Sequence, residues 1–217
     1  MRRAGHYVEV FEQDRIIGGR MATTRVGMTA FDHGAQYLTA RGQLFSSFLK
    51  EMEAAGYAAR WLPVAVKGGE KGAGQLHPWY VGTPGMSAIV RPLAESVRIH
   101  TGRRAHTLQR SDRGGWQIWF DDETSVGPFA AVAVATPAPQ AQLLLGKLDD
   151  LADQIARVRM SPCWALMVRL DQQLLSGQDV FSDMSEVIRW VSRNNSKPGR
   201  SSGGDVIVIH ASQAWSR

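Results

Sequence analysis

The alternation of hydrophobic and polar residues along the chain predicts a mixture of strands and helices. Residues 7–11 are apolar at most positions and predict a buried strand that ends at Glu12. Residues 41–55 carry apolar side chains at helical spacing, and Gly56 follows as a stop signal. We predict further strands at residues 59–66, 75–81, 97–108, 115–120, 129–135, 163–170, 187–191 and 206–210, and further helices at residues 84–96, 140–145 and 149–157. This order of elements favours an α/β protein.

Glycine-rich segments separate the predicted elements. Residues 18–20 predict a tight turn, residues 68–74 a hairpin connection, and residues 194–204 a long mobile loop. Residues 1–4 predict the tail of a helix that Gly5 ends. Since a βαβ unit places its first strand and turn before such a helix, we expect the chain to start inside a fold. We also expect residues 211–217 to stop short of the natural end of that fold.

Composition and charge narrow the class of protein. The 217 residues are 44% hydrophobic and 21% charged, which is typical of a globular protein. A single cysteine rules out an intrachain disulfide and favours a reducing, cytoplasmic location. We find no signal peptide and no apolar run of the ~18–20 residues that span a bilayer, so no membrane partner is expected. The net charge of +5 comes from scattered basic residues, which favours phosphates of a nucleotide ligand over a nucleic acid.

Glu12 and the turn that follows it are the first candidates for chemistry. An acidic residue at the carboxyl end of a strand in a dinucleotide-binding fold accepts hydrogen bonds from the adenosine ribose. The glycine fingerprint expected about 20 residues earlier would lie before Met1, so Glu12 alone is weak evidence. Gly18, Gly19 and Arg20 strengthen it. Paired glycines permit a close backbone approach, and a planar guanidinium suits a pyrophosphate.

The segment from Glu12 to Arg20 resembles the second FAD motif of the flavin-containing amine oxidase superfamily. Five further runs, in the same order, resemble bacterial renalase-like oxidoreductases of that superfamily. They are FDHGAQYLTAR at residues 31–41, WYVGTPGMSAI at 79–89, ATPAPQA at 135–141, IRWVSRNNSKP at 188–198 and IHASQAWS at 209–216. The chain departs from the family pattern at Leu38, and the family's first glycine loop and its C-terminal flavin segment have no counterpart in it.

The resemblance implies a doubly wound FAD/NAD(P)-binding, Rossmann-like domain with a second, mixed-sheet substrate domain, both truncated. We expect residues 1–58 and 83–140 to form the FAD-binding domain. We expect residues 59–82 to form a substrate-domain hairpin and residues 141–217 to form an incomplete substrate domain.

The resemblance also implies a role for each motif residue. Glu12 would hold the ribose, and Gly19, Arg20 and Met21 would lie at the phosphates. Gln36 and Tyr37 would lie near the isoalloxazine ring. The adenosine side would be met by Arg104, Thr136 and Pro137, and the substrate by Arg189, Trp190 and Asn194 or Asn195.

The activity implied is oxidation of a small molecule by hydride transfer to FAD, with O2 as the final acceptor and hydrogen peroxide as the product. The implied substrates are reduced nicotinamide nucleotides, as dihydro isomers, and amines are the less secure choice. Two alternatives stay open. One is a non-catalytic remnant that cannot hold FAD, and the other is a nucleotide-binding module of another dehydrogenase.

Other chemistries find little support in the sequence. Ser87 lacks the second glycine of a G-x-S-x-G elbow and fits a helix N-terminus better. The six histidines show no metal-ligand spacing, so no metal is expected. His33 is open between a flavin-pocket role and a structural one.

Other aromatic and sulfur-containing side chains favour structural roles. We expect Cys163 to be a core thiol, and Trp116, Trp119 and Trp164 to pack the core. Trp190 is evenly balanced between the core and a substrate wall.

Overall fold

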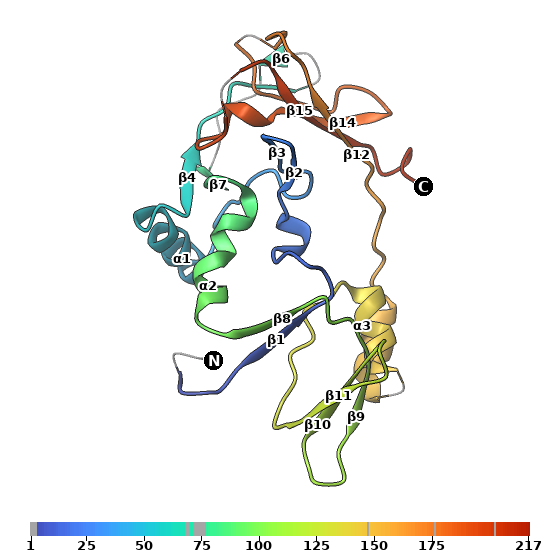
Figure 1. Ribbon diagram of the computed structural model, residues 1–217. Helices are drawn as coiled ribbons and strands as arrows, with labels where there is room; N and C mark the ends of the chain where they lie inside the picture. The colour runs from blue at the N-terminus through green and yellow to red at the C-terminus, as the bar shows by residue number, and fades with distance from the viewer. Residues whose placement is uncertain (1–3, 68–69, 72–76, 147, 176, 202) are drawn as a thin grey trace. The chain divides into compact units, whose positions relative to one another are not determined.

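The structure is a computed structural model of the 217-residue chain. The structure describes residues 4–67, 70–71, 77–146, 148–175, 177–201 and 203–217 (Figure 1). By contacts the chain forms two compact units, the first made of residues 1–15 and 97–161 and the second of residues 16–96 and 162–217. The domain boundaries expected after residues 58, 82 and 140 separate cofactor-binding from substrate-binding segments, whereas the two units are defined by contacts. Those boundaries therefore stay a prediction.

The first unit combines a short parallel pair with an antiparallel sheet and two helices. β1 pairs in parallel with β8, so that Glu12 lies opposite Thr101. The antiparallel sheet has the strand order β11–β10–β9. The elements of this unit are β1 (Glu9–Glu12), β8 (Arg98–Thr101), β9 (Ala105–Arg110), β10 (Trp116–Phe120), β11 (Ser125–Phe129), α3 (Ala138–Leu145) and α4 (Asp149–Ala156).

Alternation in β10 accounts for the core of the first unit. Ile118 and Phe120 are two residues apart, so both point to one face, where they form a buried cluster with Leu108. Val132 and Val134 pack against this cluster from the segment after β11. The strand predicted at residues 129–135 is therefore wrong in position. The apolar alternation reflects packing on the core, and within the described residues this segment pairs with no strand.

The second unit is built around a mixed sheet of six strands in the order β12–β15–β14–β13–β5–β6. β13 and β5 run parallel, and the other neighbours are antiparallel. The strands are β5 (Ala65–Lys67), β6 (Glu70–Lys71), β12 (Ala165–Arg169), β13 (Val180–Ser182), β14 (Ile188–Arg193) and β15 (Val206–Ala211). β5 and β13 lie far apart in sequence, so the sheet joins the two stretches of chain that make up this unit.

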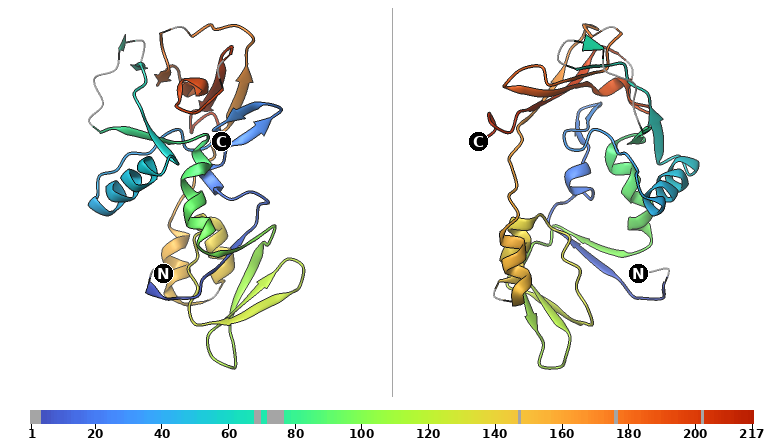
Figure 2. Two further views of the ribbon diagram at one scale, coloured as in Figure 1. Left: turned by 60° about the vertical axis from the view of Figure 1, so that its left-hand side comes forward. Right: turned by 180° about the vertical axis from the view of Figure 1, so that it is seen from behind.

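A hairpin and several short elements pack beside this sheet. Figures 1 and 2 show the β2–β3 hairpin next to β15, where Phe31 packs on Val206 and Val208. α1 lies against β4, and Met52 shares a buried cluster there with Ala58. The elements are η2 (Gly19–Met21), β2 (Thr24–Val26), β3 (Thr29–Phe31), α1 (Gln43–Ala54), β4 (Ala58–Trp61), β7 (Trp79–Gly82), η3 (Met86–Val90), α2 (Arg91–Glu95) and η4 (Asn194–Ser196).

Several predictions for the second unit are confirmed and others are corrected. The helix at residues 41–55 is present as α1, whereas the helix at residues 84–96 is divided into η3 and α2. Cys163 and Trp164 were predicted to lie in the core, but both are exposed, because they precede β12 at the edge of the sheet. Residues 1–3 and most of the predicted hairpin connection at 68–74 lie outside the described residues.

The segment predicted as a long mobile loop, residues 194–204, contains some of the most deeply buried polar groups. Asn194 is fully buried and Lys197 is 2% exposed. Glycine and serine content indicated mobility, but the polar side chains of this segment have partners elsewhere in the unit. The mixed α/β class is confirmed, and no helix within the described residues is long and apolar enough to cross a bilayer.

Candidate functional site

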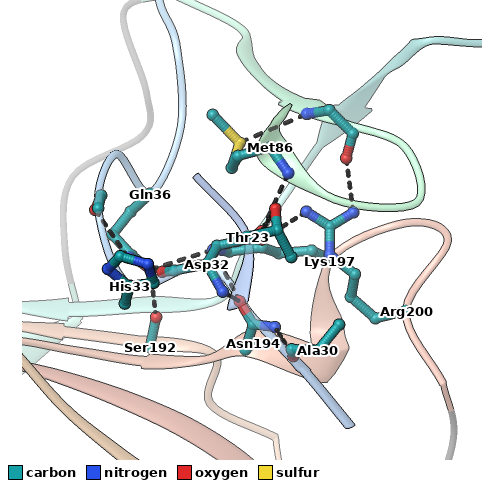
Figure 3. A network of polar contacts seen from close by, with 12 residues as sticks. Thr23, Ala30, Asp32, His33, Gln36, Met86, Ser192, Asn194, Lys197 and Arg200 are labelled. Carbon is teal, nitrogen blue, oxygen red and sulfur yellow. Dashed lines mark hydrogen bonds and ion pairs between the residues drawn. The ribbon is translucent and has the colours of Figure 1, made fainter. Parts of the chain in front are cut away.

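Asp32 lies at the centre of a buried polar network in the second unit (Figure 3). It directly follows β3, and none of its surface is exposed. Its Oδ1 accepts hydrogen bonds from Thr23 Oγ1 at 2.7 Å and from the Met86 backbone N–H at 2.9 Å. Its Oδ2 accepts from Lys197 Nζ at 3.4 Å and from a guanidinium N–H of Arg200. The carboxylate is thus bound on both oxygens by groups from three separate segments.

Lys197 and Arg200 reach Asp32 from the segment that follows β14. The side chain of Lys197 is fully buried and that of Arg200 is 2% exposed. Lys197 Nζ also donates to Asn194 Oδ1 at 3.1 Å and lies 5.5 Å from the centre of the Trp61 ring. Arg200 Nη1 donates to the Gly82 carbonyl at 2.6 Å. Two buried cations therefore share one carboxylate.

This charge arrangement shifts the ionisation of both partners. Burial by itself raises the pKa of Asp32, but the positive charges of Lys197 and Arg200 outweigh it and hold that pKa below its usual value. Burial lowers the pKa of Lys197 to about 8, and the charge of Arg200 acts in the same direction, while Asp32 opposes both. Because Arg200 already neutralises Asp32, Lys197 is the cation of the network that gives up its proton more readily.

Gln36 uses its whole amide group inside the protein. Its Nε2 donates to the backbone carbonyls of Asp32 and Gly34, the latter at 3.0 Å. Its Oε1 accepts from Ser192 Oγ at 2.7 Å and from Lys197 Nζ at 3.0 Å. The side chain therefore folds back on residues 32–36 and ties this loop to β14 and to Lys197.

The glycine turn before β2 lies against the same loop. The Arg20 carbonyl accepts a hydrogen bond from the Ala35 N–H at 2.9 Å, and a Cβ on Gly34 would stand 2.1 Å from that carbonyl oxygen. Gly18 and Gly19 have φ values of +127° and +49°, which glycine adopts without strain. Arg20 is exposed. The turn and the loop are thus joined by a backbone hydrogen bond, and their close approach requires the absence of a side chain at Gly34.

An aromatic cluster borders the loop at Tyr37. The Tyr37 and Trp79 rings are stacked, with centroids 3.8 Å apart and planes at 4°. Trp190 lies 5.6 Å from Tyr37, and Trp61 lies 5.6 Å from Trp79. The indole N–H groups of Trp61 and Trp190 are buried and find no hydrogen-bond partner within the described residues. The cluster is therefore apolar and tightly packed, and it encloses two buried indole donors that lack a partner within the described residues.

The candidate residues of the first unit lie in its loops and strand ends. Glu12 is half-buried at the end of β1, and its Oε1 accepts a hydrogen bond from the Asp14 N–H at 3.0 Å. Arg104 is exposed before β9, with its Nε 3.6 Å from Asp121 Oδ2. Thr136 is exposed, and Pro137 caps the N-terminus of α3.

The structure brings some predicted site residues together. Met21, Tyr37 and Trp190 pack against one buried cluster, and Gln36 is linked to Asn194 through Lys197. Arg189 lies apart, exposed on β14. His33 is half-buried, and its carbonyl accepts from His210 Nε2 at 2.8 Å. Sequence reasoning did not single out the other members of the network and cluster, although five of them stand inside the quoted runs. Those five are Asp32, Trp79, Met86, Ser192 and Lys197, and the three outside the runs are Thr23, Trp61 and Arg200.

Two family models match the chain. An NAD(P)-binding Rossmann-like domain matches residues 1–52, which defines a nucleotide-binding α/β fold. Flavin containing amine oxidoreductase matches residues 67–211. The chain belongs to the flavin-containing amine oxidoreductase family. The expected class, a Rossmann-like domain joined to a second mixed-sheet domain, is thereby confirmed.

Solved structures share this fold at low sequence identity. Putrescine oxidase bound to putrescine is 12% identical, with a TM-score of 0.71 over 98% of this chain and 72% of its own. An oxidoreductase from Methanosarcina mazei is 16% identical, with a TM-score of 0.68 over 97% and 74%. A protein from Pyrococcus furiosus is 11% identical, with a TM-score of 0.69 over 97% and 75%.

Membership in this family implies a flavin, and the residues present fit such a group. Gly34 leaves the backbone bare where it meets the Arg20 carbonyl, and Gly18 does so where it meets Ser87. Arg20 presents an exposed guanidinium beside them, which suits a phosphate. No group of three acidic, histidine or cysteine residues arranged to hold a metal ion is found within the described residues.

Proposed function

We propose that the chain forms part of a renalase-like, FAD-dependent oxidoreductase that oxidises a reduced nicotinamide nucleotide. The observation that carries this proposal is the contact between the Arg20 turn and the loop at Gly34 and Ala35, with the Tyr37 rings beside it. A phosphate-binding turn, a bare backbone and an aromatic surface are the three features that a dinucleotide cofactor with a planar ring needs.

The motif residues receive their proposed roles from the resemblance together with their exposure. Arg20 would bind the pyrophosphate of FAD, with Gly19 and Met21 at its backbone. Glu12 would accept hydrogen bonds from the ribose hydroxyls. Arg104, Thr136 and Pro137 would meet the adenosine side.

Gln36 would act without touching the flavin, since its amide is already used within the loop. Tyr37 would border the ring system of FAD. When bound, FAD supplies the hydride acceptor and the route of the electrons to O2, with hydrogen peroxide as the product.

The substrate side is proposed to lie at the aromatic cluster. The stacked Tyr37 and Trp79 rings would orient a flat heteroaromatic ring and exclude water from it. A carboxamide that enters the cluster would supply the acceptor that the buried indole N–H of Trp190 lacks. Arg189 is exposed and could bind a nucleotide phosphate. Asn194 would act through Lys197, because its amide is buried and bonded to Ala30 and Lys197.

An amine is the second candidate substrate, because the family model is that of amine oxidoreductases. A small aliphatic amine would use the apolar faces of the cluster but neither the indole donors nor Arg189. The two candidates therefore differ in what they would require of Trp190 and Arg189.

Stepwise loading of the purified chain tests the proposal. FAD is titrated first, and uptake is followed by the quenching of flavin fluorescence. The loaded protein is then mixed without oxygen with dihydro isomers of NADPH, with ordinary NADPH, or with putrescine. Bleaching of the visible flavin band reports reduction, and hydrogen peroxide is measured after O2 is readmitted.

The outcomes separate the candidates. We expect the nicotinamide isomers to bleach the flavin faster than putrescine, and the reverse order would favour an amine oxidase. FAD uptake without bleaching by any probe would indicate a non-catalytic member of the family. Failure to take up FAD at all would contradict the proposal and leave a nucleotide-binding module of another kind.

A further inference from the structure

Lys197 is an unusual residue for the place it occupies. Its side chain is fully buried, and the carboxylate that it contacts is already paired with Arg200. Charge balance at Asp32 therefore needs only one of the two cations. A second buried ammonium group costs free energy, since burial removes its hydration without a carboxylate of its own. Stability alone would favour an apolar side chain of the same length at this position.

The hydrogen bonds of Lys197 lead to the loop at residues 32–37. Lys197 Nζ and Ser192 Oγ are the two donors to Gln36 Oε1, at 3.0 and 2.7 Å. With its oxygen held in this way, the amide of Gln36 keeps its Nε2 directed at the Asp32 and Gly34 carbonyls. Rotation of the amide by half a turn would place its NH2 group against the ammonium group of Lys197, which can only donate. Lys197 therefore sets the orientation of the amide together with the two carbonyl acceptors.

The same loop continues into the surfaces proposed for the cofactor. Ala35 N–H is bonded to the Arg20 carbonyl, and the N–H and carbonyl of Leu38 are bonded to Tyr80 at 2.8 and 2.9 Å. Between these two anchor points the backbone of residues 36–37 is fixed by the side chain of Gln36. The order of this short stretch therefore depends on Lys197 and Ser192, which are both buried.

We propose that Lys197 is a positioning residue that, through Gln36, fixes the backbone of residues 33–37 for contact with the flavin. This inference rests on the proposed FAD-binding function. Lys197 touches neither cofactor nor substrate in it. Its contribution is a loop that is already ordered before the cofactor arrives, so that binding does not have to supply the ordering entropy.

Three variants test this inference. Lys197→Met removes the donor and its charge but leaves Asp32 paired with Arg200, so the variant is expected to fold. Ser192→Ala removes the other donor to Gln36 Oε1 without changing any charge. Lys50→Met, at an exposed position on α1, is the matched control for the lysine-to-methionine change. FAD affinity, amide hydrogen exchange of the peptide covering residues 32–38, and the thermal midpoint are measured for each.

We expect Lys197→Met to weaken FAD binding roughly tenfold, the equivalent of about 1.4 kcal/mol, and to accelerate hydrogen exchange at residues 32–38. Its thermal midpoint should stay close to that of the wild type, or rise. Ser192→Ala should change affinity and exchange in the same direction, and Lys50→Met should change neither. A merely structural Lys197 would give the opposite pattern, a lower midpoint with normal exchange and affinity in the folded protein.

The result that overturns the inference is normal FAD affinity and normal exchange at residues 32–38 in both Lys197→Met and Ser192→Ala. If Lys197→Met fails to fold, Ser192→Ala decides the matter by itself. If the wild-type chain takes up no FAD, the proposed function is contradicted and this inference falls with it. Loss of affinity limited to the variants leaves the proposed function intact, so the two failures are distinguishable.

Discussion

Among single residues, Asp32 determines the charge balance of the site. It is bonded on both oxygens, and its contacts with Lys197 and Arg200 join residues 165 and 168 positions away in the chain. Replacement of Asp32 by asparagine would keep the shape of the side chain but leave two buried cations without a counter-charge. Such a change is therefore expected to lower the free energy of unfolding.

We expect Asp32→Asn to lower the free energy of unfolding by about 3–5 kcal/mol, the range for a buried ion pair that loses one partner. Urea denaturation at neutral pH measures this change. Asp153→Asn, at an exposed position of α4, serves as the control and should leave stability nearly unchanged. A loss of less than about 1 kcal/mol in Asp32→Asn would mean that water reaches the two cations.

The ionisation of Lys197 makes a second residue-scale prediction, on pH. The charged and titratable groups around it are Asp32, Arg200 and His210. Its pKa is about 8 in the folded protein and 10.5 ordinarily. Below pH 8 both states carry the proton, and the cost of burying the charge is fully present. Between pH 8 and 10.5 the unfolded chain binds the proton and the folded chain has released it, so stability rises with pH.

The test compares wild type and Lys197→Met by urea unfolding across this window. The free energy of unfolding of the wild type should increase relative to that of the variant as pH rises from 8 to 10.5. Other groups that titrate in this range are common to both proteins. A constant difference between the two proteins over this range would show that Lys197 keeps its ordinary pKa.

Arg20 supplies the prediction that bears on the cofactor itself. Its guanidinium is exposed, so Arg20→Ala should leave the fold intact. Loss of a charge-assisted hydrogen bond of about 1.5–3 kcal/mol would weaken FAD binding by roughly 10- to 100-fold. Fluorescence titration measures this, with Arg25→Ala on the exposed β2 strand as the control. Equal FAD affinity in Arg20→Ala and wild type would remove Arg20 from the phosphate site.

At the scale of elements, the contact between the Arg20 turn and the loop after β3 is defined by Gly34. We expect Gly34→Ala to lower stability by about 1–3 kcal/mol and to reduce FAD uptake, because its Cβ would stand 2.1 Å from the Arg20 carbonyl oxygen. Gly42→Ala is the matched control, since Gly42 has φ −95° and open space around its Cβ position. Thermal unfolding and FAD titration of both variants are the measurements. Equal behaviour of the two alanine variants would mean that the turn and the loop separate easily.

Hydrophobic periodicity predicted those helices and strands that have a regular buried face of their own. The helix α1 and the strands β14 and β15 follow from periodicity, because their buried faces repeat at regular spacing. β12 was predicted too, but its start was placed at Cys163, because hydrophobic alternation does not show that a strand lies at a sheet edge. The short strands β2 and β13 were missed, since three residues are too few for a recognisable period.

The candidate site was predictable only in part for a related reason. Arg20, Gln36 and Tyr37 stand in runs that resemble a known family, so their positions could be identified. Lys197 stands in such a run as well, but glycine, serine and proline around it indicated a mobile loop. The buried Lys197 pairs with Asp32, which is 165 positions away in the chain. A pairing over that distance leaves no local pattern in the sequence.

At the scale of the whole molecule, the chain passes between its two units after residues 15, 96 and 161, and residues 157–164 contain the last of these crossings. This stretch has no helix or strand, and its side chains are exposed. Arg157 and Arg159 within it are therefore accessible to trypsin. We expect early cleavage after one of them, followed by co-elution of the two fragments on size exclusion.

The two fragments should stay together because both contribute strands to the second unit. β13 pairs with β5, and Phe31 packs on β15. Separation is expected only in denaturant, and the double variant Arg157→Gln/Arg159→Gln should resist the early cut. Elution of the C-terminal fragment by itself under native conditions would contradict the six-stranded sheet.

The pairing of Asp32 with Lys197 and Arg200 also has a consequence for biosynthesis. A ribosome adds residues in order, so the acidic loop after β3 leaves the exit tunnel long before either of its cations has been translated. During that interval the carboxylate is hydrated and the loop at Gly34 and Gln36 lacks the donors that order it. The second unit therefore closes late, when the last strands emerge. A stalled or prematurely ended nascent chain would display this loop open, as a substrate for chaperones or proteases.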